Sequence, residues 1–114
     1  MGLGLGIEIG LGSVTTTEVT IPGKLADGDW SIEDAGTGGS ADVTVSNPPS
    51  DGGSAFTDLE YKIDGDIWRT SGGTAPTFNI PSGFTDGVAT NVRLRYVNAV
   101  GNALQSNQEP VTTS

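Results

Sequence analysis

Apolar and polar residues alternate through most of the chain from about Leu25 onward, with the two-residue period of half-buried β-strands. The segments that alternate in this way are WSIE, ADVTV, DLEYKI, DIWRT, PTFNI, NVRLRYV and QEPVTT. Turn signals such as Asp64-Gly65 separate them, and no apolar stripe with the period of a helix is present. Seven short strands at this spacing predict an all-β fold, an antiparallel β-sandwich. The residues predicted to point inward are Trp30, Ile32, Val43, Val45, Leu59, Tyr61, Ile63, Phe78, Ile80, Val92, Leu94 and Tyr96.

A different pattern opens the chain, where MGLGLGIEIGLGS has an aliphatic residue at every odd position from 3 to 11. Glycine fills the even positions except for Glu8. Glycine-rich termini are often flexible, but flexible linkers carry serine and other polar residues, and an exposed apolar ribbon promotes aggregation. The pattern therefore favours an extended arm that docks against another protein. The predicted partner-binding residues are Leu3, Leu5, Ile7, Ile9 and Leu11.

The arm is predicted to extend over residues 1–24 and the sandwich over residues 25–114, with the turn signal Pro22-Gly23 between them. The Thr-rich stretch 14–24 keeps Val19 and Ile21 in the same odd register as the ribbon. The first residues lack a basic n-region and contain Glu8, so we expect no signal peptide, and the apolar run is too short for a membrane span.

Composition and charge exclude several classes of function. The formal net charge is −9, from 5 Lys+Arg against 14 Asp+Glu, and the cations form no basic run. Nucleic acid is therefore not an expected partner. The chain contains no histidine and no cysteine, so it cannot build the usual zinc sites or the Ser-His and Cys-His nucleophile pairs. We expect no cofactor and no enzymatic activity.

The segment VTVSNPPSDGGSAFTDLEYKIDGDIW, followed by VRLRYVNAVG, resembles fibronectin type III domains of the bacterial and phage kind. The resemblance covers roughly residues 26–114 and implies two packed antiparallel sheets without catalytic machinery. The chain departs from that family at Asn47, where a core Trp is usual, and at Thr90, where a Tyr is usual. Trp30, Trp68 or Phe84 is expected to fill the space.

The acidic residues allow two kinds of site, each with a structural alternative. The sequence DGD at 27–29 and again at 64–66 could offer oxygens to calcium, but each supplies only two carboxylates, and Asx-type turns explain both. Asp58 and Glu60 could form an acid/base pair. As alternating strand residues they are expected to face solvent beside Arg93 and Arg95, in a cross-strand charge ladder. We predict no metal ligands and no catalytic residues.

Trp68 is the one side chain outside the arm with a possible role in binding. It could stack on a sugar or a partner surface, or it could be a rim residue that covers the core. The leading hypothesis is a non-enzymatic structural protein of a phage virion, present in many copies and assembled in the host cytoplasm. In this hypothesis it is a head decoration protein that contacts other capsid or tail proteins through its arm. The alternatives are a tail component, or a module of a secreted bacterial protein that binds carbohydrates such as host cell-surface glycans.

Overall fold

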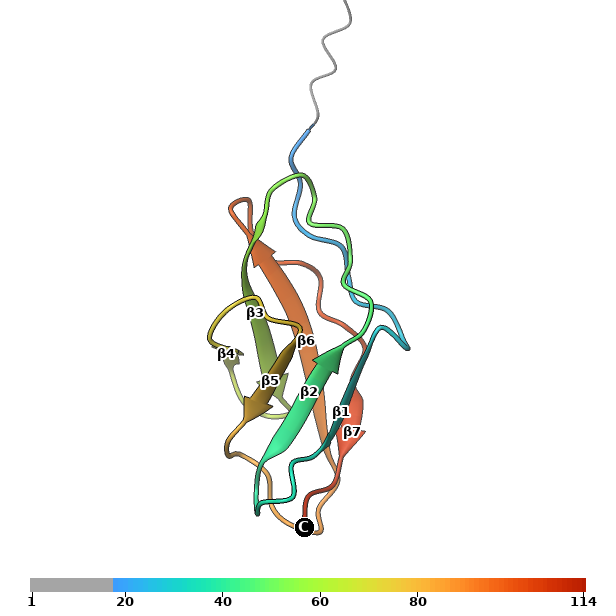
Figure 1. Ribbon diagram of the computed structural model, residues 1–114, viewed down its shortest axis with the longest axis vertical. Coiled ribbons are helices and arrows are strands. Elements are labelled where there is room, and N and C mark those ends of the chain that lie inside the picture. Colours follow the sequence, from blue (N-terminus) through green and yellow to red (C-terminus); the bar gives the residue numbers. More distant parts are fainter. Residues whose placement is uncertain (1–17) are drawn as a thin grey trace, which may run out of the picture.

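A computed structural model describes residues 18–114, so the predicted arm contacts at positions 3 to 11 lie outside the described residues. Seven strands follow one another along the described chain (Figure 1). Their bounds are β1 Trp30–Asp34, β2 Ala41–Val45, β3 Phe56–Ile63, β4 Trp68–Thr70, β5 Thr77–Ile80, β6 Thr90–Asn98 and β7 Glu109–Val111. Residues 18–114 contain no helix long and apolar enough to cross a membrane.

The strands form two antiparallel sheets, which confirms the predicted sandwich. One sheet has the order β1-β2-β5 and the other the order β4-β3-β6-β7. The longest pair, β3 and β6, is aligned from Phe56 opposite Asn98 to Ile63 opposite Val92, with a register shift between Phe56 and Asp58. This pair is the centre of the larger sheet and fixes which side chains face outward.

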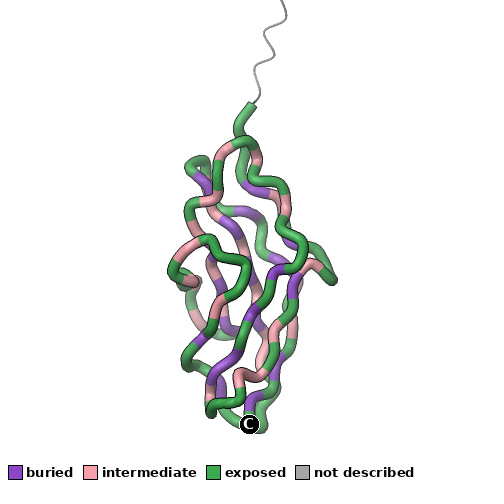
Figure 2. The backbone as a smooth tube through the Cα atoms, viewed as in Figure 1, coloured by how far each residue is buried: buried purple, intermediate pink, exposed green. Residues whose placement is uncertain are grey.

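The core lies between the two sheets and is built from the predicted alternation (Figure 2). Val43, Leu59 and Leu94 are each at most 1% exposed. Ile32 and Phe78 are only partly buried but pack against this core. The fully assembled set of buried apolar residues is Leu25, Trp30, Ala41, Val43, Val45, Leu59, Tyr61, Ile63, Ile80, Phe84, Val92, Leu94, Tyr96 and Val111.

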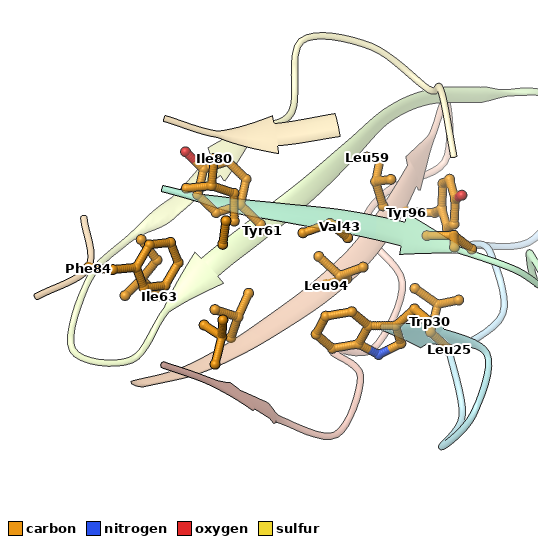
Figure 3. Close-up of a cluster of buried hydrophobic side chains, with 14 residues drawn as sticks. Leu25, Trp30, Val43, Leu59, Tyr61, Ile63, Ile80, Phe84, Leu94 and Tyr96 are labelled. Carbon is orange, nitrogen blue, oxygen red and sulfur yellow. The ribbon is translucent and has the colours of Figure 1, made fainter. Parts of the chain in front are cut away.

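Two aromatic residues fill the core where the resemblance left the packing open. Trp30 and Phe84 are both buried, towards opposite ends of the cluster drawn in Figure 3. Trp68 does not belong to the core cluster or to the residues packed against it. Asn47 is exposed, and its Nδ2 donates to Asp29 Oδ1 at 3.0 Å. Asn47, the second residue after β2, therefore belongs to a polar turn, and Trp30 on the neighbouring strand supplies the buried indole.

The turn between β3 and β4 shows how the sequence sets strand ends. Asp66 N–H donates to Ile63 O at 2.8 Å, and Gly65 has a φ of 82°. A residue with a side chain rarely adopts this left-handed conformation, so glycine permits the tight reversal. The predicted Asp64-Gly65 turn is confirmed.

Candidate functional site

The segment before the first strand, residues 18–24, is bonded to one end of the sandwich. Thr20 N–H donates to Gly52 O and Gly23 N–H donates to Ser50 O, both at 2.9 Å. Residues 50–53 belong to the connection between β2 and β3. In Figure 1 this end lies opposite the end that carries the C-terminus. Residues 20–23 are thus tied to a defined position on the sandwich.

The side chain of Asn98, at the end of β6, joins three segments at this end. Its Nδ2 donates to Thr20 O at 2.7 Å and to Asp51 O at 2.8 Å. Its Oδ1 accepts from Val100 N–H at 2.9 Å and from Gly101 N–H at 3.2 Å. Asn98 is 3% exposed, and its amide uses both donors and both lone pairs. We call this set of four hydrogen bonds the Asn98 clamp.

Gly52 allows the segment 18–24 to lie this close to the loop. A Cβ built at Gly52 would lie 2.3 Å from Thr20 O and 2.6 Å from Ile21 O, both of them backbone atoms. Its φ of +75° is also in the left-handed region. Any side chain at position 52 would therefore displace residues 20 and 21.

Apolar side chains are exposed around the clamp. Val19 is 45% exposed, Ile21 is 40% exposed and Val100, in the clamped turn, is 52% exposed. We call these three residues the end patch. Val19 and Ile21 continue the odd register of the aliphatic residues at positions 3 to 11. The sandwich leaves these two side chains exposed, although it binds the backbone of Thr20 between them.

Trp68 lies on the outer face of the larger sheet. It is the register partner of Lys62, and the neighbours of Lys62 along β3, Tyr61 and Ile63, are buried. The guanidinium of Arg95 lies 4.1 Å from the centroid of its ring. Arg95 Nε also donates to Glu60 Oε1 at 2.7 Å. The interpretation of Trp68 as a rim residue that covers the core is therefore wrong, and one face of its indole is occupied by Arg95.

The predicted charge ladder is present in part. Glu60 and Arg95 are opposite each other in the register and form an ion pair, with side chains 22% and 20% exposed. Asp58 instead accepts from Thr70 Oγ1 at 2.7 Å. Arg93 lies opposite Lys62, and its Nη2 donates to Gln108 Oε1 at 2.9 Å.

Both DGD sequences use their carboxylates in turns. Asp29 Oδ2 accepts from Ala26 N–H at 2.8 Å, and Asp66 Oδ1 accepts from Ile67 N–H at 2.8 Å. The hydrogen bond from Ile67 N–H, followed by the one from Arg69, lowers the pKa of Asp66. Within residues 18–114, no group of three or more acidic side chains is arranged to hold a metal ion.

Sequence reasoning assigned no role to Asn98 or Gly52. Asn98 belonged to the quoted VNAVG motif, and an asparagine shortly before a glycine suggests a turn. That signal accounts for the bonds from Oδ1 to Val100 and Gly101. It carries no information on the contact with Thr20, which lies 78 positions earlier.

Known proteins show similarity to this chain in structure only. No family model and no curated protein matches the sequence. Domains A168–A170 of titin match 84% of this chain with a TM-score of 0.59 and 19% identity, and titin kinase with its flanking domains matches 84% with a TM-score of 0.54 and 20% identity. The matched regions make up 32% and 17% of those two chains. A Fn3-like protein from Clostridium thermocellum matches 84% of this chain and 94% of its own length, with a TM-score of 0.53 and 16% identity. Together with the two antiparallel sheets, these matches show that the chain has a fibronectin type III-like β-sandwich fold.

Proposed function

We propose that this chain is a non-catalytic display module that is attached to a larger assembly through its N-terminal arm. The sandwich is the displayed part, and Leu3, Leu5, Ile7, Ile9 and Leu11 are the anchoring residues. In its specific form, the proposal is a head decoration protein of a tailed-phage virion, present in many copies and assembled in the host cytoplasm. Its partners are then other structural proteins of the virion.

One observation carries the proposal: the segment that leads into the sandwich, residues 18–24, is hydrogen-bonded to one end of it, and that end exposes apolar side chains. The Asn98 clamp and the Thr20–Gly52 bond hold the backbone of residues 20–23 in place. The side chains of Val19 and Ile21 remain exposed and keep the alternation of residues 3 to 11. An exposed apolar surface of this kind, which the aliphatic residues at positions 3 to 11 precede in the sequence, suits contact with another protein. The C-terminus lies at the opposite end and would point away from that contact (Figure 1).

The two carboxylates that could form an acid/base pair are both used in structural interactions. Glu60 is paired with Arg95, and Asp58 accepts a hydrogen bond from Thr70. A carboxylate that holds an arginine is a poor general acid, because the cation favours its ionised form. This arrangement supports a binding or structural role over catalysis.

Co-sedimentation of the chain with virus particles tests the anchoring role. Particles purified on a density gradient would be probed with an antibody against the sandwich, for the full chain and for a variant lacking residues 1–13. We expect the truncated chain to stay folded and to remain at the top of the gradient. The double variant Leu5→Asp with Ile7→Asp should behave in the same way, whereas the matched control Leu5→Ile with Ile7→Leu should sediment with particles. Truncated chain in the particle fraction would refute the anchoring role.

The same gradient separates the head from the tail. Isolated capsids that retain the chain support the head decoration protein, and isolated tails that retain it support the alternative of a tail component. Glycan binding through Trp68 is the second alternative, favoured only by the partial exposure of that side chain. It predicts that Trp68→Ala abolishes retention on immobilised host glycans and leaves particle attachment unchanged.

A further inference from the structure

The outer face of each sheet carries two like charges directly opposite each other, and the two pairs have opposite sign. On the larger sheet, Lys62 of β3 is the register partner of Arg93 of β6. On the smaller sheet, Glu33 of β1 is the register partner of Asp42 of β2. Like charges directly opposite each other in a sheet are destabilising. Each of the two outer faces therefore contains one pair of like charges that destabilises the folded chain.

The basic pair is not neutralised within its own face. The ion pairs among residues 18–114 are Arg69 with Asp66 and Arg95 with Glu60, so neither Lys62 nor Arg93 has a carboxylate within 4.0 Å in this part of the chain. Two other carboxylates of β3 on this face are bonded to other residues, Glu60 to Arg95 and Asp58 to Thr70. A row of side chains crosses the sheet here, with Trp68 and Gln108 on either side of the basic pair. We call these four residues the basic row.

The acidic pair has a corresponding environment. Glu33 and Asp42 are both exposed, and neither forms an ion pair within the described part of the chain. A shallow depression of about 360 Å³ lies beside them, lined further by Thr44, Thr77 and Phe78. The only side-chain partner that Asp42 has among the described residues is the Nδ2 of Asn79, at 2.9 Å. We call the pair and this depression the acidic face.

We propose that the basic row of one copy of this chain binds the acidic face of a second copy. Each pair consists of directly opposed residues on neighbouring antiparallel strands, whose Cα atoms lie about 4.5–5.5 Å apart. Two cations therefore meet two carboxylates, and Trp68 lies beside the cations as the depression lies beside the carboxylates. This match of charge and position argues for a second copy rather than for an unrelated acidic ligand.

The net charge of −9 limits this contact but does not prevent it. Exposed charges further apart than about 8 Å are largely screened at physiological ionic strength, whereas charges in direct contact are screened much less. The repulsion between the two acidic copies therefore falls faster with added salt than the attraction between the opposed pairs. The contact is weak, and it is favoured where copies are held close together.

The two surfaces are on opposite sides of the sandwich, so the contact is head-to-tail. Val43 and Leu94 are buried between the sheets, which places Asp42 and Arg93 on opposite outer faces. A heterologous contact of this kind leaves one free surface at each end and continues into a ring or a row of copies. This inference does not depend on the proposed anchoring role, because it uses only the charges of the sandwich.

A charge exchange tests the contact on the full chain by sedimentation velocity over a range of protein concentrations. One variant carries Lys62→Glu with Arg93→Glu, and the other carries Glu33→Lys with Asp42→Lys. We expect the wild type to show a sedimentation coefficient that rises with concentration and each variant alone to stay monomeric. An equimolar mixture of the two variants should associate again, because each restores the charge that the other lacks. Association of either variant alone as strong as that of the wild type would overturn the proposal, as would a wild type that stays monomeric throughout.

A zero-length carbodiimide cross-link on the wild-type chain gives a second readout that needs no charge reversal. The reagent joins an amine to a carboxylate in contact, and the chain contains two lysines, Lys24 and Lys62. We expect dimers whose linked peptides join Lys62 to Glu33 or Asp42, residues too far apart within one copy to be linked. Lys62→Arg should remove these dimers and the matched control Lys24→Arg should keep them. Dimers linked through Lys24 instead, or no dimers at all, would contradict the proposal.

Discussion

The substitution Asn98→Asp replaces Nδ2 by an oxygen. It therefore removes the two hydrogen bonds that Asn98 donates and keeps the two that it accepts. The carboxylate still accepts from Val100 N–H and Gly101 N–H, so the turn after β6 keeps its hydrogen bonds. The second carboxylate oxygen replaces Nδ2 and faces Thr20 O and Asp51 O, which cannot donate to it. We expect residues 18–23 to detach from the sandwich while the strands remain paired.

The magnitude follows from the bonds that are lost. Each hydrogen bond contributes about 0.5–1.5 kcal/mol net, so the loss of two predicts about 1–3 kcal/mol. A buried carboxylate that faces two carbonyl oxygens adds a further cost. Because Thr20 and Asp51 are exposed, water can solvate their carbonyl oxygens after the segment detaches, which limits the total. We expect the free energy of unfolding to fall by about 2–4 kcal/mol, with Asn98→Ala at the upper end because it loses all four bonds.

Two measurements check this prediction. Urea unfolding gives the change in stability, and hydrogen exchange reports on the amides of Thr20 and Gly23, which donate to the loop. We expect these two amides to exchange much faster in Asn98→Asp, while that of Leu94 in the centre of β6 keeps its protection relative to global unfolding. A loss below about 0.5 kcal/mol together with unchanged protection at Thr20 would refute the role of the clamp, since even one lost bond is worth that much.

Four other substitutions follow from the structure. Leu94→Ala removes a fully buried side chain and should cost about 2–5 kcal/mol in thermal or urea unfolding; a loss below about 0.5 kcal/mol would show that the side chain is not in the core. Gly52→Ala should expose Thr20 N–H to exchange as Asn98→Asp does, because the new Cβ displaces the segment 18–24. Glu60→Gln should cost only about 0–1 kcal/mol at low salt, since the ion pair with Arg95 is partly solvated. Tyr96→Phe should reduce the loss of stability at high pH. Burial raises the pKa of Tyr96 above 10.0 in the folded chain, so its contribution is complete below that pH and is lost as the pH rises through the folded pKa. Equal alkaline unfolding of wild type and variant would contradict this.

Most of the fold could be predicted from the alternation of apolar and polar side chains, because in a half-buried strand every second residue faces the core. Leu59, Tyr61 and Ile63 were predicted to face the core, and all three are buried. A charge ladder of Asp58 and Glu60 beside Arg93 and Arg95 was also predicted, and the pair of Glu60 with Arg95 is the part of it that the structure contains. The resemblance to fibronectin type III domains supplied the strand order that alternation alone does not determine.

The parts that sequence did not predict depend on contacts between distant segments. Trp68 follows a turn and precedes an arginine, which fits both a core rim and an outer face, and only its register with Lys62 decides between them. The contact of Asn98 with Thr20 joins the end of β6 to the start of the described chain, and no local pattern encodes it. The contacts proposed for Leu3, Leu5, Ile7, Ile9 and Leu11 stay predictions.

The Asn98 clamp also has a mechanical consequence. A pull on the chain from before Glu18 reaches the hydrogen bonds of Thr20 and Gly23 before it reaches β1, since these residues lie between the point of load and the first strand. These two bonds and the Asn98 clamp are in series with the sandwich, and we expect them to break at a lower force than the packed core because they are few and lie at one end. In the proposed anchored chain, breaking these bonds would release residues 18–24 and lower the tension before the strands of the sandwich separate.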